Sequence, residues 1–186
     1  NRKNKFIFVK KIKNNKFFIN CVVKCANQIG YSGQNSLELL NNLNKSNFFK
    51  KINFAKLLTG YIITHTRWAS VGDVNLSNCH PLNNINKNNQ SLFYMNGDVI
   101  NYKKIKQKQI ERNEYITNDK LCSNDLQPLP GIFLKNKFNN FNKIDGSFVL
   151  LHHNSLKPEN INILKKGSQG FYFTENTDGD LFFSSD

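Results

Sequence analysis

A segment that follows a short apolar run holds an arginine, a tryptophan and a hydroxyl group close together. Residues 64–70 read Thr-His-Thr-Arg-Trp-Ala-Ser, and they contain the single tryptophan of the chain and one of its three arginines. Arg67 offers a rigid, planar fork of donors that can hold a substrate carboxylate through two hydrogen bonds. Taken alone, the segment is better explained by an arginine paired with a surface carboxylate beside a buried Trp68.

An Asn-Gly pair follows a second apolar run. Asn96 and Gly97 come directly after residues 92–95, which read Leu-Phe-Tyr-Met. Such a pair at the end of a strand usually marks a turn. A side-chain amide and an exposed glycine N–H can also form the two-donor oxyanion hole that acyl transfer requires. The pair therefore predicts either a turn or a catalytic hydrogen-bonding site.

Hydrophobic periodicity predicts the elements that position these residues. In the first half of the chain we expect a hairpin, two helices that end at Gly60, and two short strands. Their ranges are 6–12 and 17–23 for the hairpin, 36–43 and 47–58 for the helices, and 61–65 and 92–95 for the strands.

The second half is richer in strands. A helix is expected to begin at Tyr102, and strands are expected at 147–152, 161–164, 171–174 and 181–184. The Asn-rich stretches 83–90 and 136–143 are expected to be surface insertions. Many strands, few helices and no regular β-α alternation predict an α+β layered fold.

The net charge of +13 is the strongest compositional signal. Almost all of the positive charge is lysine, and the enriched residues Lys, Asn, Ile and Phe share A/T-rich codons. The base composition of the genome therefore accounts for the charge, and the lysines are scattered along the chain. Because a nucleic-acid footprint should cluster, nucleic acid is not expected as a partner.

The cysteines and the lengths of the apolar runs indicate the cellular compartment of the protein. Four irregularly spaced cysteines in 186 residues do not form a disulfide framework. No run of 18 apolar residues is present, and the first residues lack the apolar core of a secretory signal. We expect one cytoplasmic domain with no membrane contact.

Three motifs, HTRWAS at 65–70, NCHPL at 78–82 and NGDVINY at 96–102, together resemble the glutaminase domain of class II (N-terminal-nucleophile) glutamine amidotransferases. The resemblance is greatest to the glutamine–fructose-6-phosphate aminotransferase kind, in the same order and at similar separations. Weaker similarities lie at 124–130, 145–148, 166–168 and 181–186. The resemblance covers about Gly60 to Asp186, and it implies that residues 1–186 form one such domain, a four-layer αββα sandwich.

The resemblance also implies a reaction. Glutamine is hydrolysed to glutamate and ammonia by an N-terminal cysteine, whose thiolate attacks the side-chain amide while its free α-amino group acts as the base. Arg67 and Ser70 would bind the substrate α-carboxylate, and Asp125 would bind the α-ammonium group. The other residues carried over are Asn96 and Gly97 for the oxyanion hole, Trp68 for covering the site, and His65 and His80 for shaping its loops.

The chain departs from the family pattern in three places. Asn1 stands at the start where the family has its cysteine, and neither Cys21 nor Cys79 has the free amino group needed to replace it, so the nucleophile is expected upstream. Met95 precedes Asn96 where relatives often have histidine. The resemblance ends at Asp186, where the family continues toward its sugar-phosphate isomerase half.

The expected partners follow from the resemblance. They are L-glutamine, fructose 6-phosphate as the ammonia acceptor in the isomerase half, giving glucosamine 6-phosphate, and a second copy in a homodimer, with no metal and no cofactor. The alternative is a pseudo-glutaminase that lacks the nucleophile and uses its basic surface to bind a partner such as RNA.

Overall fold

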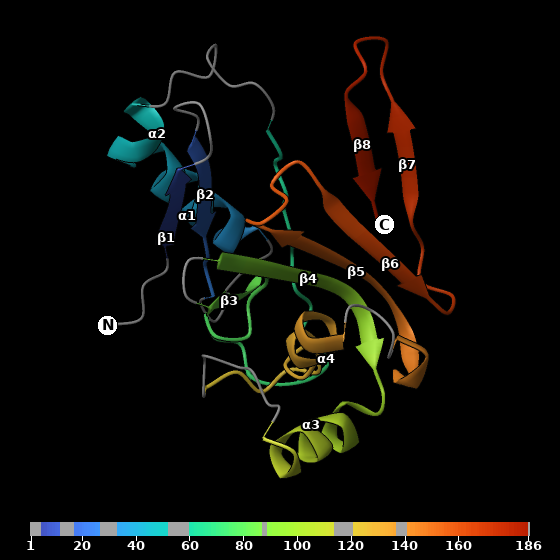
Figure 1. Cartoon of the computed structure of the whole chain (residues 1–186). Coiled ribbons are helices and arrows are strands. Elements are labelled where there is room, and N and C mark those ends of the chain that lie inside the picture. The colour runs from blue at the N-terminus through green and yellow to red at the C-terminus, as the bar shows by residue number, and fades with distance from the viewer. Residues whose placement is uncertain are drawn as a thin grey trace.

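The computed structural model describes residues 5–11, 17–26, 33–51, 60–86, 89–113, 121–136 and 141–185. Figure 1 shows their course. The strands are β1 (Lys5–Lys11), β2 (Phe17–Val23), β3 (Leu82–Asn86), β4 (Asn89–Val99), β5 (Gly146–Asn154), β6 (Ile161–Lys166), β7 (Tyr172–Glu175) and β8 (Leu181–Ser184). The helices are α1 (Gln34–Asn44), α2 (Asn47–Lys51), α3 (Tyr102–Glu111) and α4 (Leu129–Asn136), with a 3₁₀ turn, η2, at Phe141–Lys143. None of these helices is long and apolar enough to cross a membrane.

The central sheet is antiparallel, with the order β3-β4-β5-β6. β4 is its longest strand, and it pairs with β5 from Ser91 to Val99. β3 pairs with β4 only as far as Leu82, which lies opposite Phe93. Beyond Phe93, the described part of the chain therefore gives β4 a neighbouring strand on the β5 side only. That open edge carries the candidate site described below.

One face of the central sheet packs against helices. Phe93 and Phe148, which are fully buried, lie in one cluster with Leu129 and Phe133 of α4. α3 packs beside α4, where the Gln109 side chain donates to the carbonyl of Pro128 over 2.9 Å. Burial of apolar surface of this kind is the main favourable term in folding.

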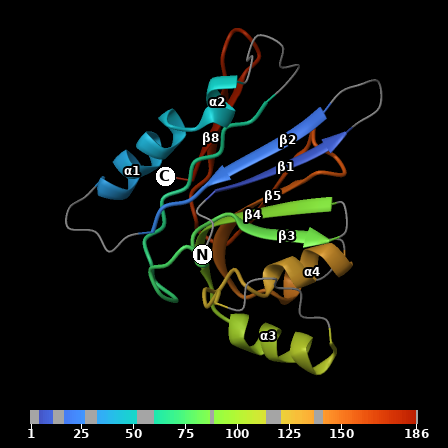
Figure 2. The ribbon, with the colours of Figure 1, turned by 90° about the vertical axis from the view of Figure 1, so that its left-hand side faces the viewer.

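The opposite face packs against the β1–β2 hairpin. Leu92 and Tyr94 are buried together with Val22 of β2. Asn20 of β2 donates to the side-chain oxygen of Gln90 over 2.9 Å. In Figure 2 the hairpin lies above the central sheet and α4 and α3 lie below it, while α1 lies beside the hairpin. The central sheet is thus covered on both faces.

β7 and β8 form a second hairpin that stands apart from the central sheet, at the upper right of Figure 1. Its apolar side chains are exposed on both faces, with Phe173 at 77% and Leu181 at 66%. Phe173 and Leu181 lie on one face of the ribbon, and Tyr172 and Phe182 lie on the other.

The structure confirms most of the expected elements. The first hairpin, the helix within α1, the helix from Tyr102 and the strands within β4 to β8 are present. The helix expected at 47–58 is confirmed for α2, and residues 52–58 lie outside the described residues. Of the stretch 136–143, residues 137–140 also lie outside them, and 141–143 form η2.

Three expectations differ from the structure. Residues 61–65 are not a strand: inward and outward residues alternate, as in an extended chain, but no described strand pairs with them. The supposed insertion at 83–90 contains most of β3 and the start of β4, with Asn84 and Gln90 buried. α4 was not expected; its Pro130 lies in the first turn, where proline is tolerated in a helix.

Candidate active site

The open edge of β4 exposes backbone groups at every second residue. In an antiparallel pair, alternate residues direct their N–H and C=O toward the neighbouring strand, and the residues between them direct theirs away. The N–H groups of Met95 and Val99 bind side chains outside the β4–β5 ladder, so they point away from β5. Gly97 lies between them with the same parity. Its N–H is therefore directed toward the same open edge.

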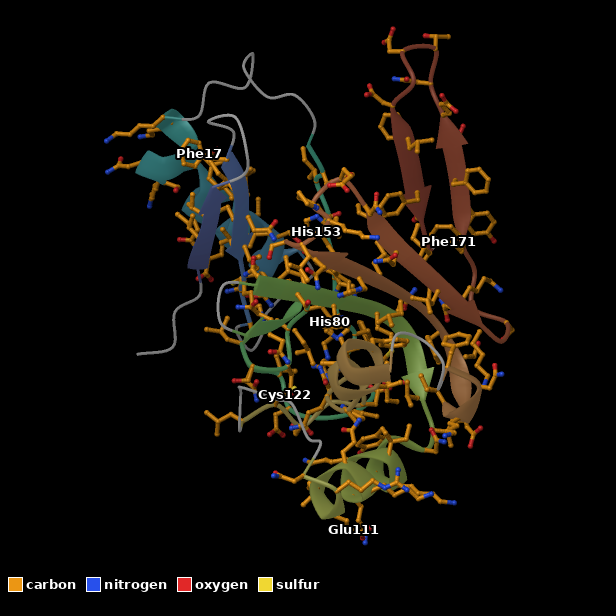
Figure 3. The ribbon with its side chains drawn as sticks, viewed as in Figure 1. Phe17, His80, Glu111, Cys122, His153 and Phe171 are labelled. Carbon is orange, nitrogen blue, oxygen red and sulfur yellow. The ribbon has the colours of Figure 1, made fainter. Side chains whose placement is uncertain are left out.

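Two histidines bind Met95 at the start of this edge. The N–H of Met95 donates to Nδ1 of His80 over 3.2 Å, and Nε2 of His65 lies 2.9 Å from the Met95 carbonyl oxygen. The two imidazole rings are 4.3 Å apart, and Figure 3 labels His80 beside β4. Burial, followed by the charges of His65, Arg67 and Lys24, holds the pKa of His80 well below its ordinary value. His80 is therefore neutral at pH 7.

Gly97 requires the absence of a side chain. Its φ of 104° lies in a region that L-residues rarely adopt. An added Cβ would overlap the carbonyl oxygen of Ser147 and would lie 2.8 Å from the Cα of Phe148. The glycine thus lets β5 approach closely while its own N–H faces the opposite edge. The expectation of a simple turn at Asn96-Gly97 is wrong, because both residues lie within β4.

Asn96 directs its side chain to the sheet face that bears the first hairpin, since it has the parity of Leu92 and Tyr94. Its amide donates to Oγ of Ser185 over 2.9 Å. An amide group carries two N–H bonds, and this contact orients the group. Ser185 directly follows β8, and the contact joins the end of the second hairpin to the site.

Asp125 lies at the other end of the edge. Its Oδ2 accepts the Val99 N–H over 2.7 Å, and the residue is buried, with 6% of its surface exposed. Burial raises the pKa of Asp125, while the Val99 hydrogen bond and the positive charge of Arg67 oppose that rise. Asp98 adds a smaller rise through its like charge. A cation bound here would favour the ionised carboxylate.

Arg67 binds the loop that follows it. Its guanidinium donates to the carbonyl oxygens of Val71 and Asp73, the latter over 3.3 Å. It makes no ion pair among the described residues, although its charge acts on Asp125, Cys79 and His80. The two carbonyls hold the guanidinium fork in place.

Asn78, from the NCHPL motif, ties the Arg67 loop to the Asp125 loop. Its side-chain oxygen accepts the N–H groups of Ser123 and Asn124, over 2.7 and 3.2 Å. Its side-chain nitrogen donates to the Asp73 carbonyl over 2.9 Å. The residue is fully buried. Sequence reasoning missed this role, although the position of Asn78 next to Cys79-His80 in a motif was a usable signal.

Ser70 donates to the Asp98 carboxylate over 2.6 Å. Asp98 is exposed and lies two residues after Asn96, on the same face of β4. It was not among the predicted site residues. The strand spacing from Asn96 is the signal that could have identified it. Ser70 is thus held by a carboxylate, where the family resemblance implied an interaction with the substrate.

Trp68 is 95% exposed, so it covers nothing in this structure. The inward positions of this segment are Ile63, His65, Arg67 and Ala69, and successive residues of an extended chain point to opposite sides. An inward Arg67 therefore places Trp68 outward. The idea of a buried tryptophan is wrong, and the covering role stays a prediction for the substrate complex.

Cys79 is half-buried, and its Sγ lies 3.5 Å from the Cys25 carbonyl oxygen. Burial raises the pKa of this thiol more than the Lys24 and Arg67 charges lower it. A thiol of raised pKa is a poor nucleophile at neutral pH. Among the described residues, no group of three or more His, Cys, Asp or Glu side chains could hold a metal ion.

Comparison with known proteins gives one partial similarity. No family model matches the chain. A stretch of 51 residues is 43% identical to the glutamine–fructose-6-phosphate aminotransferase (isomerizing) of Encephalitozoon cuniculi. The stretch covers 27% of this chain and 7% of that enzyme, so the chain matches only a small part of the relative's length. The chain therefore has at most a distant relation to this aminotransferase.

Proposed function

We propose that this chain is the glutaminase domain of a glutamine amidotransferase, and that it hydrolyses glutamine to glutamate and ammonia. The observation that carries the proposal is the order of groups along the open edge of β4. The outward N–H of Gly97 lies two residues from Val99, which holds Asp125, and the charge of Arg67 acts on that carboxylate. Two hydrogen-bond donors, the Gly97 N–H and the Asn96 amide, thus lie near a positive side chain, Arg67, and a negative one, Asp125.

These charges suit a free amino acid. Arg67 would bind the α-carboxylate and Asp125 the α-ammonium group, so glutamine is distinguished from a glutaminyl side chain within a protein. The substrate ammonium also compensates the cost of an ionised, buried Asp125. Ser70 would contribute through the loop that it shares with Arg67, and Trp68 would close over the bound substrate.

The reaction requires a cysteine with a free α-amino group, and the proposal places it upstream of Asn1. The α-amino group takes the thiol proton, and the thiolate attacks the amide carbon of glutamine. The carbonyl oxygen becomes an oxyanion that accepts hydrogen bonds from the Gly97 N–H and the Asn96 amide. The protonated amino group then gives its proton to the departing ammonia. Water hydrolyses the thioester, which releases glutamate and restores the thiol.

The wider assignments belong to the same proposal. The domain would have the four-layer αββα sandwich of N-terminal-nucleophile hydrolases, supported by a central sheet that is covered by a β-hairpin on one face and by helices on the other. Ammonia would pass to fructose 6-phosphate in an isomerase domain, in a homodimer. The similarity to the Encephalitozoon enzyme supports this acceptor.

The test is ammonia release from L-glutamine by the full-length protein, measured with a coupled glutamate dehydrogenase assay. Turnover with glutamine and at least tenfold weaker kcat/KM with glutaramate, which lacks the α-amino group, is the expected result. An inactive full-length protein, or equal use of both compounds, would contradict the proposal.

A second function is favoured by one observation. The exposed side of α3 gathers Lys103, Lys104 and Lys108, with Lys106 half-buried and Arg112 just beyond the helix. Such a basic helix suits an acidic partner. It supports the alternative that the chain is a pseudo-glutaminase, which would retain the fold and bind a partner such as RNA without catalysis.

A further inference from the structure

His80 stands where the next residue pair of the β3–β4 ladder would be. Leu82 lies opposite Phe93, and continuing that register by two residues brings His80 opposite Met95. A strand would present a backbone carbonyl to the Met95 N–H at this point. Nδ1 of His80 accepts that hydrogen bond instead, over 3.2 Å. The imidazole thus takes the place of a strand.

His65 binds the other backbone group of Met95, its carbonyl oxygen, which a neighbouring strand would also have bound. Its Nε2 lies 2.9 Å from the Met95 carbonyl oxygen and 3.1 Å from Nδ1 of His80. A carbonyl oxygen only accepts hydrogen bonds, so Nε2 of His65 carries a proton. Nδ1 of His80 accepts from Met95, so it carries none. The arrangement assigns a proton to Nε2 of each ring when His80 is neutral.

We propose that His65 and His80 are a pair of positioning residues that set the oxyanion donors of the site through Met95. This inference rests on the proposed glutaminase function. Met95 immediately precedes Asn96 and Gly97, so a shift of its backbone moves both donors. A displacement of about 1 Å in a catalytic group can cost about 100-fold in rate. Neither histidine needs to touch the substrate.

The surroundings of the pair keep it in the required state. The titratable and charged groups that act on His80 are His65 and Arg67 of the segment before it and Lys24 after β2, and all of them disfavour its protonation. From β4 it meets the Met95 backbone. Protonation of His80 at Nδ1 would place its N–H opposite the Met95 N–H. Two donors would then face each other, and the hydrogen bond between them would break. The hydrogen bond from the Met95 N–H to His80 should therefore break only at a pH below the ordinary histidine pKa of about 6.5.

Amide side chains of two lengths provide the test. The asparagine amide reaches about as far as Nδ1 of histidine, and the glutamine amide about as far as Nε2. In the full-length protein, His80→Asn and His65→Gln should keep kcat within about threefold of wild type, because the hydrogen bonds to Met95 are retained. The reversed variants His80→Gln and His65→Asn should lower kcat by about 10- to 100-fold with little change in KM. His153→Gln, at the far end of β5, is the matched control and should leave kcat unchanged.

Amide exchange gives a readout that does not depend on activity. Exchange at the Met95 N–H, followed by NMR, should be slow in wild type and in His80→Asn, and faster in His80→Gln. Equal kcat in all four variants, or a rise in KM with unchanged kcat, overturns the positioning role. Absence of ammonia release by wild type overturns the glutaminase and the catalytic role together. An unchanged rate of amide exchange at the Met95 N–H in His80→Gln would overturn the hydrogen bond between His80 and Met95, whatever the kinetic results.

Discussion

The backbone N–H of Val99 donates to Oδ2 of Asp125 over 2.7 Å, which fixes a buried carboxylate two residues beyond Gly97 on one edge of β4. The hydrogen bond holds the carboxylate in place, and burial raises its pKa above the ordinary value of 3.8. An ionised Asp125 therefore carries a desolvation cost in the free protein, which a bound cation would reduce further.

Asp125→Asn should stabilise the free protein and impair glutamine binding. The pKa of the folded state is raised, so the folded state gains stability from Asp125 only at low pH and loses it as pH rises through the folded pKa. Asparagine removes this loss while its oxygen can still accept the Val99 N–H. We expect a higher melting temperature at pH 7, a difference that disappears below about pH 3.8, and KM raised by about 10- to 100-fold. Thermal unfolding across pH and glutaminase kinetics measure the two effects. A lower melting temperature at pH 7 would contradict the assignment, and Asp178→Asn, in the exposed β7–β8 turn, is the control.

Arg67→Lys should impair glutamine use although the charge is kept. The guanidinium reaches two backbone carbonyls, those of Val71 and Asp73, and still has donors for a carboxylate. A lysine ammonium cannot hold that fork geometry. The loss should be about 2–4 kcal/mol, or about 30- to 1,000-fold in kcat/KM. Arg112→Lys, at the exposed end of α3, should behave as wild type. Wild-type kinetics in Arg67→Lys would refute the carboxylate-binding role.

Asn96→Ala should act on kcat. An oxyanion donor binds charge that develops in the transition state, so its removal should lower kcat by about 10²- to 10³-fold with little change in KM. Ser185→Ala removes only the group that orients the amide, and we expect a smaller fall. Steady-state kinetics with glutamine distinguish the two. A raised KM with unchanged kcat would show that Asn96 binds the ground state.

Gly97→Ala should destabilise the fold far more than Gly179→Ala. Both glycines have positive φ, 104° and 82°, so alanine is strained at either position. At Gly179, in the β7–β8 turn, the nearest atom to a new Cβ is 3.8 Å away, and the cost is about 1–2 kcal/mol. At Gly97 the Cβ meets the Ser147 carbonyl, so β4 and β5 must separate. Urea unfolding of both variants gives the comparison, and equal costs would contradict the close approach.

Whether the positive charge serves a nucleic-acid partner can be tested by measuring RNA binding over a series of salt concentrations. If the net charge of +13 has no partner, the full-length protein should bind labelled RNA weakly, at about 10⁻⁴–10⁻⁶ M in physiological salt. The pseudo-glutaminase predicts sub-micromolar binding with a log–log slope of about −4 or steeper. Replacement of Lys103, Lys104 and Lys108 by glutamine should then flatten that slope. Fluorescence anisotropy measures it, and tight binding without ammonia release would favour the second function.

Apolar patterning predicted the elements that bury apolar side chains. Strand β5 follows this rule, since its Phe148, Val149 and Leu150 are buried. β3 does not, because it begins in an Asn-rich stretch and its Asn84 is buried as a polar residue. Hydrogen bonding replaces hydrophobicity there: Gln90 bonds Asn83 and Asn20. A pattern of apolar residues cannot detect a strand stabilised in this way.

The site was predictable as a set of motifs but not as a geometry. Motif reasoning selected His65, Arg67 and Gly97, which the structure places along or beside one strand edge. It did not reveal why that edge is open, because the end of β3 depends on pairing between distant residues. Asp98 and Asn78 were missed for a related reason: their roles arise from contacts between distant segments that meet only in the folded chain.

Asn78 has a consequence for how the site can change over generations. Its one side chain bonds the loop of Asp73 and the loop of Ser123, so the loop that follows Arg67 and the loop that precedes Asp125 share a support. Substitutions near Arg67 and near Asp125 should therefore be strongly epistatic, since a shift of one loop displaces the other through Asn78. If these loops bind the proposed substrate, a change of specificity would require replacements in both of them.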